Sequence, residues 1–242
     1  MRDNPLAKFG VAGVVTVFSR RGDGSMSLNC VAWQEALNNR RKFLSVLGIN
    51  YRDLVCTKQV HGKKVINVGQ KDKGSGALTY ARAFEDADGF VTAEKNLPLA
   101  IFTADCLSIF LYDPRKPAIG LLHAGWRGTE QNIAQAGVSE LVKNFGSHPD
   151  DLRVGFGPGI RVCCFEVEEN FKTNFEFGLI KRDGHTFMDL ALVNSKQLLD
   201  CGVKKENIFD PEYCTFSQSD EFFSFRKEGV KAGRLISVAM LK

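Results

Sequence analysis

The sequence predicts an α+β fold, a single domain in which mixed β-sheets pack between helices in α-β-β-α layers. Short segments rich in Val, Ile and Phe, bounded by Gly, Pro or Asp, are typical of strands and outnumber the segments with helical periodicity. Several of these segments adjoin without room for the crossover helix that a doubly wound parallel sheet requires. A chain of 242 residues permits one large domain or two small ones, and we expect one domain over residues 1–242.

Strand patterns and helical patterns alternate unevenly along the chain. The predicted strands cover residues 11–18, 54–60, 65–68, 89–92, 99–102, 108–112, 118–122, 152–156 and 235–240. Apolar residues at helical spacing predict three helices, at residues 33–47, 134–145 and 192–203, the last of which closes before Pro211. The polar, glycine-rich stretch at 69–76 is expected to form a surface loop.

The composition argues against several classes of partner and location. The net charge is only +4, from 32 basic and 28 acidic residues that are scattered along the chain, so neither nucleic acid nor a membrane is expected as a partner. No segment approaches the roughly 20 apolar residues needed to cross a bilayer. The chain has seven cysteines, an odd number, and their spacing is not typical of a disulfide framework. The N-terminus has no signal-peptide pattern. We therefore expect a cytoplasmic protein.

Two histidines and one cysteine stand out as candidate metal ligands: His61, Cys106 and His123, which we name the metal trio. The chain has only four histidines, and two of them fall where predicted strands end. Two imidazoles and a thiolate suit zinc, and they leave a fourth position for water or substrate, as in catalytic sites. The alternative is that Cys106 is a small buried hydrophobe and both histidines make ordinary hydrogen bonds.

Two carboxylates are candidates for supporting this site. Asp105 directly precedes Cys106, and Asp88 ends a short acidic stretch. Either could orient a metal ligand or act as an acid or base during catalysis. A carboxylate that caps a turn or a helix is at least an equal alternative for both.

Three arginines could recognise phosphate, because a guanidinium matches phosphate oxygens bidentately. Arg127 follows His123 by four residues, Arg226 ends an aromatic stretch, and Arg40 lies on the first predicted helix. A solvated arginine is the alternative at each position, most of all for Arg40.

The remaining cysteines and histidines carry weaker signals. Cys163 and Cys164 are adjacent, and adjacent cysteines rarely pair because the geometry is strained, so we expect them to be structural or to line the site. The sequence leaves the role of Cys214 open. His148 and His185 lie in polar loops and are expected at the surface.

At these motifs the chain resembles the YfiH/YlmD family, also called the laccase-domain or multicopper polyphenol oxidase family. The resemblance runs through nearly the whole chain. It includes Gln59-Val-His-Gly62, Ala104-Asp-Cys-Leu107, His123-Ala-Gly-Trp-Arg-Gly-Thr129, Cys163-Cys-Phe-Glu-Val167 and Phe222-Phe-Ser-Phe-Arg226. The zinc ligands of that family fall on the metal trio.

The resemblance implies a purine nucleoside phosphorylase, which cleaves adenosine, inosine, guanosine or methylthioadenosine with phosphate, and which in some members also deaminates adenosine. Zinc is the implied cofactor, with copper possible in vitro. Purine nucleosides and inorganic phosphate are the implied partners of a monomer or weak homodimer. We expect Arg40, Arg127 and Arg226 to bind phosphate or substrate, with Asn29 as a weaker candidate, and Asp105 to join the metal trio in catalysis.

Other functions remain open at this stage. A copper polyphenol oxidase would use the same two histidines and cysteine, but a four-copper enzyme needs a further cluster of histidines that this chain does not supply. A metal-free cysteine hydrolase would use Cys106 as nucleophile and His123 or His61 as base. A purely structural zinc would require a fourth protein ligand, such as Cys163 or Cys164.

Overall fold

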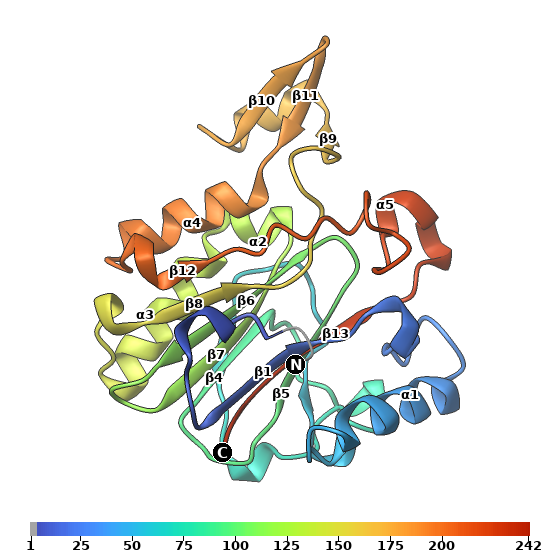
Figure 1. Ribbon diagram of the computed structural model, residues 1–242, viewed down its shortest axis with the longest axis vertical. Helices are drawn as coiled ribbons and strands as arrows, with labels where there is room; N and C mark the ends of the chain where they lie inside the picture. The colour runs from blue at the N-terminus through green and yellow to red at the C-terminus, as the bar shows by residue number, and fades with distance from the viewer. Residues whose placement is uncertain (1–3) are drawn as a thin grey trace.

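Two β-sheets lie face to face at the centre of the molecule (Figure 1). The computed structural model describes residues 4–242. The larger sheet has six strands in the order β12-β8-β6-β7-β4-β3. These strands are β3 (Val65–Asn67), β4 (Gly89–Thr92), β6 (Leu107–Asp113), β7 (Ala118–Ala124), β8 (Arg153–Phe156) and β12 (Ile208–Phe209). Its central pairs are antiparallel and its two outer pairs are parallel, so the sheet is mixed.

The smaller main sheet has four strands in the order β1-β13-β5-β2. They are β1 (Val14–Phe18), β2 (Val55–Cys56), β5 (Leu99–Thr103) and β13 (Leu235–Leu241). The last strand of the chain, β13, pairs antiparallel with both β1 and β5, so the two ends of the sequence close this sheet together. All seven residues of β13 are buried, as expected for a strand covered on both faces.

Helices cover the outer faces of the two sheets and complete four layers. Helix α1 (Trp33–Ser45) packs its buried face on the four-stranded sheet, through Phe43 and Leu44. Helices α3 (Ile133–Phe145) and α4 (Leu190–Asp200) cover the six-stranded sheet. A third apolar core, which includes Phe110 and Leu99, fills the space between the sheets. The predicted α+β class with mixed sheets in α-β-β-α layers is therefore confirmed.

A close approach between α3 and the six-stranded sheet explains one glycine of that helix. A Cβ atom at Gly137 would lie 2.5 Å from Cδ1 of Leu122 on β7, so only glycine lets the helix axis come this near. The helix then ends at Gly146, whose φ of 64° is left-handed and whose N–H donates to the carbonyl of Val142.

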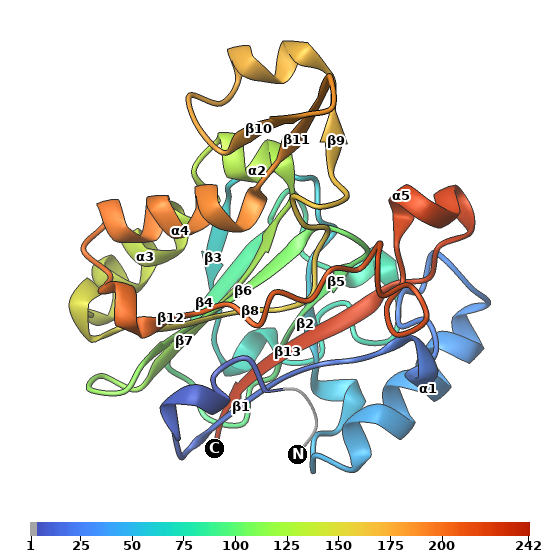
Figure 2. The ribbon, with the colours of Figure 1, turned by 45° about the horizontal axis from the view of Figure 1, so that its top comes forward.

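A third, small sheet stands away from the two main ones, beyond α2 and α4 (Figures 1 and 2). It consists of β9 (Glu166–Val167), β10 (Leu179–Arg182) and β11 (His185–Met188), in the order β10-β11-β9. The short helices α2 (Trp126–Glu130) and α5 (Phe225–Glu228) complete the regular elements. Neither this sheet, nor β12, nor either short helix was predicted from the sequence.

The predicted elements are otherwise present, with shifted ends. Each of the nine predicted strands overlaps an observed one, and the three predicted helices correspond to α1, α3 and α4. The largest error is at 54–60, where only Val55–Cys56 is a strand. His61 was expected at a strand end and lies instead in an irregular loop. The stretch at 69–76, expected to be a loop, contains one short 3₁₀ turn, Gln70–Asp72.

None of the helices in residues 4–242 combines the length and the apolar character that crossing a membrane requires.

Candidate metal centre and its pocket

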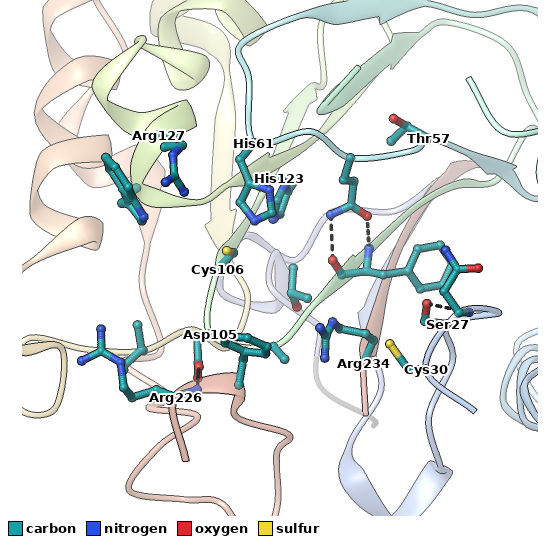
Figure 3. A pocket seen from close by; sticks show the side chains of 18 of the residues that line it. Ser27, Cys30, Thr57, His61, Asp105, Cys106, His123, Arg127, Arg226 and Arg234 are labelled. Atoms are coloured by element: carbon teal, nitrogen blue, oxygen red, sulfur yellow. Dashed lines mark hydrogen bonds between the residues drawn. The ribbon is translucent and has the colours of Figure 1, made fainter. Parts of the chain in front are cut away.

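The fold brings the metal trio together from three separate segments. His61 lies in the loop after β2, Cys106 in the turn between β5 and β6, and His123 near the end of β7. Their ligand atoms all lie within 4.8 Å of one another, and the two imidazole rings are 4.7 Å apart between centroids at an angle of 75° (Figure 3). The sequence predicted this set, and the structure places its three donors at one point.

The pairing of β6 with β7 accounts for the contact between Cys106 and His123. The antiparallel register sets Leu107 opposite Ala124 and Ser108 opposite His123, so the turn before β6 meets the end of β7. Gly125 follows at this junction. A Cβ atom there would lie 2.9 Å from both the Cys106 sulfur and Cδ2 of His61, so the glycine makes room for the trio.

A buried carboxylate, Asp88, orients both histidines. Its Oδ1 lies 2.7 Å from Nδ1 of His123 and accepts the N–H of His61 at 2.9 Å. Its Oδ2 accepts the N–H groups of Val60 and Gly62 at 3.1 and 2.7 Å. Because Asp88 takes Nδ1 of His123, Nε2 is the nitrogen left for the ligand set. The same carboxylate holds His61 at a left-handed φ of 62°, which is uncommon outside glycine and costs about 1–3 kcal/mol.

The electrostatics of the trio favour a thiolate. Burial raises the pKa of Cys106, but the neighbouring His123 and His61 outweigh it and lower that pKa to about 6. Burial likewise lowers the pKa of His123, whereas the Cys106 thiolate and the Asp88 carboxylate raise it to about 9. A deprotonated sulfur is the form that binds metal ions.

This donor set fits zinc. Around a tetrahedral zinc ion, bonds of about 2.0–2.1 Å to nitrogen and 2.3 Å to sulfur place the donor atoms within about 4 Å of one another. The donor atoms of the metal trio lie within 4.8 Å of one another, so a small movement of the side chains would reach this geometry. His123 is buried, whereas His61 is exposed to the pocket. The residues that would hold the ion are His61, Cys106 and His123, and the side toward the pocket stays open.

The trio lines a cavity of about 1200 Å³. In Figure 3, Arg127 and Arg226 lie on one side of the trio, and Ser27, Cys30 and Arg234 lie on the other. Aromatic side chains supply much of the apolar lining: Tyr80, Phe102, Trp126, Phe165, Phe171 and Phe225. Drug-sized ligands fill pockets of roughly 300–1,000 Å³. The cavity is therefore large enough for two small molecules side by side.

Two of the three arginines predicted to bind phosphate, Arg127 and Arg226, line this cavity. Arg127 is exposed and lies 4.1 Å from the ring centroid of Trp126. Arg226 is also exposed, lies 5.1 Å from the ring centroid of Phe165 and donates one N–H to the carbonyl of Glu166 at 2.7 Å. Each arginine is thus steadied by an aromatic ring while it faces the pocket.

The third predicted arginine, Arg40, is built into the wall. Its side chain is 2 % exposed and donates to the carbonyls of Met26 and Ala77 at 2.7 and 2.8 Å. Burial lowers the pKa of its guanidinium. Two donors are already used, so Arg40 shapes the cavity more than it can bind phosphate. Asn29, the weaker candidate, lies exposed at the rim.

Asp105 lines the cavity, but both oxygens of its carboxylate accept hydrogen bonds from other segments of the chain. Oδ1 accepts the hydroxyl of Thr215 and Oδ2 accepts the N–H of Arg226, both at 2.6 Å, while its carbonyl accepts the N–H of Ile160 at 2.7 Å. These bonds position α5 and its arginine. Asp88 and Asp105 were both predicted candidates for supporting the site, and of the two it is Asp88 that contacts members of the trio.

Sequence reasoning missed two residues of the pocket. Gln59 clamps Phe102 with two hydrogen bonds of 2.7 Å to its backbone (Figure 3). Arg234 lines the cavity and donates to the carbonyl of Ala232 at 2.6 Å. Gln59 belongs to the Gln59-Val-His-Gly62 motif, two residues before His61, and Arg234 directly precedes the last strand; these positions were the available signal.

Known proteins resemble this chain over most of its length. A family model described as "Multi-copper polyphenol oxidoreductase laccase" matches residues 28–242. The purine nucleoside phosphorylase YlmD of Bacillus subtilis is 32% identical over 216 residues, which cover 86% of this chain and 78% of that protein. A protein named adenosine deaminase RL5, from an unknown prokaryotic organism, is 30% identical over 207 residues, covering 82% and 79%. The crystal structure of YlmD from Geobacillus stearothermophilus superimposes with a TM-score of 0.92 at 30% identity, covering 96% of this chain and 93% of the other.

Proposed function

The chain belongs to the multi-copper polyphenol oxidoreductase laccase family, and we propose that it is a zinc-dependent purine nucleoside phosphorylase. The proteins similar to this chain include enzymes named purine nucleoside phosphorylase. The reaction would transfer the ribosyl group of adenosine, inosine, guanosine or methylthioadenosine to phosphate. The observation that carries the proposal is the metal trio, open to a cavity that two arginines flank. We propose that residues 1–242 act as one catalytic domain, as a monomer or weak homodimer.

The cavity supports a reaction between two small molecules. In phosphorolysis, the bond between C1′ and the purine nitrogen breaks, its electron pair leaves with the base, and a phosphate oxygen bonds to C1′. Arg127 and Arg226 would hold the phosphate by bidentate hydrogen bonds, and so bring it to C1′ as positive charge develops on the ribose. The aromatic lining would stack on the purine and keep water from C1′.

The trio would act at the centre of this cavity. Zinc, when bound, supplies Lewis acidity there. Asp88 fixes the tautomer and the orientation of His123, and it sets the loop that carries His61. Asp105, which lines the cavity, would position the backbone of Arg226. Adenosine deamination, the activity in the name of one relative, would need water in place of phosphate at the same centre.

Product analysis tests the proposal. Protein of known zinc content is incubated with adenosine and with inosine, with and without phosphate, and the products are separated by chromatography. We expect free base and ribose 1-phosphate only when phosphate is present, and inosine from adenosine if deamination also occurs. His123→Ala should abolish base release, whereas His148→Ala, an exposed histidine outside the pocket, should leave it unchanged. Absence of base release from either nucleoside would contradict the proposal.

A metal-free cysteine hydrolase is the second candidate, because the paired Cys106 thiolate and His123 imidazole resemble an activated nucleophile and its base. Activity that survives a chelator but is lost on thiol alkylation would favour it. A four-copper oxidase is disfavoured, since His148 and His185, the two histidines outside the trio, are exposed and do not line the cavity. Stoichiometric copper with intense blue colour in the purified protein would reverse that judgement.

A further inference from the structure

Three cysteines outside the metal trio form a second compact group. The sulfur of Cys163 lies 3.6 Å from that of Cys214 and 3.4 Å from that of Cys164. All three sulfurs lie within 4.8 Å of one another. Cys163 is exposed, Cys164 is half-buried and Cys214 is buried, so the group is reached from the surface and anchored in the interior. We name these residues the thiol cluster.

The backbone holds the thiol cluster together although Cys163 and Cys214 are 51 residues apart in the sequence. The segment after β8 and the segment after β12 run side by side, joined where Gly159 donates to the carbonyl of Tyr213 and Thr215 donates to the carbonyl of Gly159. Arg161 adds an ion pair with Asp210, at 2.6 Å. Cys214 therefore faces the two adjacent cysteines in a fixed frame.

The spacing of the sulfurs suits a shared ion better than a disulfide. Two thiolates on one tetrahedral ion, with bonds of about 2.3 Å, lie about 3.8 Å apart. The distances of 3.4 and 3.6 Å are close to that separation. A disulfide would use only two of the three sulfurs, and one between the adjacent Cys163 and Cys164 would be strained.

The surroundings of Cys214, the buried member of the thiol cluster, favour a thiolate. Burial raises the pKa of Cys214, but hydrogen bonds from Ser217 and from the backbone of Arg161 outweigh it and lower that pKa to about 7. Such N–H and O–H donors also stabilise metal-bound thiolates. The guanidinium of Arg182 donates to the carbonyl of Cys163 at 3.0 Å and brings a positive charge beside the cluster.

We propose that Cys163, Cys164 and Cys214 form a second metal site, which takes a soft, thiophilic cation such as Zn²⁺ or Cu⁺. Within residues 4–242 these three are the only donors grouped at this point, so a fourth ligand would come from solvent. The ion would displace the protons of Cys163 and Cys164. Burial raises the pKa of both thiols; Cys214 raises that of Cys163 further, and Cys163 raises that of Cys164.

Such an ion would brace one wall of the cavity. Phe165 and Glu166 directly follow the two adjacent cysteines and line the cavity, and the Glu166 carbonyl accepts a hydrogen bond from Arg226. Thr215, next to Cys214, donates to Asp105. The site is nevertheless separate from the metal trio, and its occupancy does not depend on the proposed reaction.

Cadmium binding to a protein that lacks the trio's sulfur tests the proposal. Reduced, metal-free Cys106→Ala protein is titrated with Cd²⁺, and the thiolate-to-metal charge-transfer absorption and the bound metal are measured. We expect one equivalent to bind and to raise the melting temperature. Adding Cys163→Ser or, separately, Cys164→Ser should weaken binding by more than the roughly 10–100-fold typical of losing a group that merely supports a ligand. Cys201→Ser, at a half-buried cysteine outside both groups, is the matched control and should bind as before.

Three results would overturn the proposal. The first is a Cys106→Ala protein that binds no Cd²⁺, and the second is one that binds it equally well after both cluster substitutions. The third is a disulfide between Cys163 and Cys214 that persists in the protein under mild reductant, as shown by thiol counting and peptide mapping, because the sulfurs would then be unavailable to a metal.

Discussion

Replacing Asp88 by asparagine is the most informative single change, because one carboxylate orients two of the three proposed ligands. Its two oxygens accept four hydrogen bonds, three from the backbone of residues 60–62 and one from His123. Asparagine keeps one oxygen and sets an NH₂ group against two donors. A hydrogen bond to a charged group contributes about 1.5–3 kcal/mol, so we expect the free energy of unfolding to fall by about 3 kcal/mol.

The same substitution should weaken zinc binding. Groups that support a metal ligand typically contribute 10–100-fold in affinity, and Asp88 supports both His61 and His123, so we expect a loss near 100-fold. Zinc affinity is measured by competition with a chromophoric chelator, and stability by urea unfolding of the metal-free protein. Asp86→Asn is the matched control, since Asp86 is an exposed carboxylate in the same loop. An Asp88→Asn protein with unchanged zinc affinity would refute the orienting role of this carboxylate.

Three other changes test separate parts of the structure. Gly125→Ala should lower zinc affinity at least tenfold in the same competition assay, because the added Cβ would lie 2.9 Å from the sulfur and from a ring carbon of the trio; unchanged affinity would mean that the trio can shift freely. Gln59→Ala removes both hydrogen bonds to the Phe102 backbone, and urea unfolding should show a loss of about 1–3 kcal/mol together with a raised KM for nucleoside. An unaltered KM would place Phe102 outside the substrate site. A hydrogen bond from Arg21 lowers the pKa of Glu228, so this carboxylate stabilises the fold above its unfolded-state pKa, and that stability is lost as the pH falls through its lower folded-state pKa. Glu228→Gln should therefore remove part of the acid dependence of unfolding, and identical pH profiles for the two proteins would contradict this.

Strong apolar patterns made most of the fold predictable from the sequence. Strand β4 was predicted with its observed ends, Gly89–Thr92, and β6 and β7 were predicted to within two residues, because each is a continuous buried run between turn residues. The prediction failed where strands are short or polar. Strand β10 ends in Lys181 and Arg182 and is mostly exposed, so its pairing with β11 leaves little trace in hydrophobicity.

The candidate metal ligands could be predicted from the sequence, but the residues that orient them could not. His61 and His123 could be chosen because the chain has only four histidines and these two fall where predicted strands end, and Cys106 because its thiolate completes a ligand set that suits zinc. The sequence could not separate Asp88 from Asp105, since their roles depend on which backbone N–H groups each carboxylate meets. The thiol cluster was equally hidden, because Cys214 reaches its partners only through the pairing of two segments that are remote in sequence.

Zinc titration of the metal-free protein tests the central claim most directly. Phosphate-dependent release of hypoxanthine from inosine is followed as zinc is added back to wild-type protein and to His123→Ala. We expect the wild-type rate to rise from near zero to a plateau as the metal trio fills, and the His123→Ala rate to stay near zero at every zinc concentration. Full activity in the metal-free wild type, or recovery of the His123→Ala protein to the same plateau, would contradict the assignment of the trio as a catalytic zinc site.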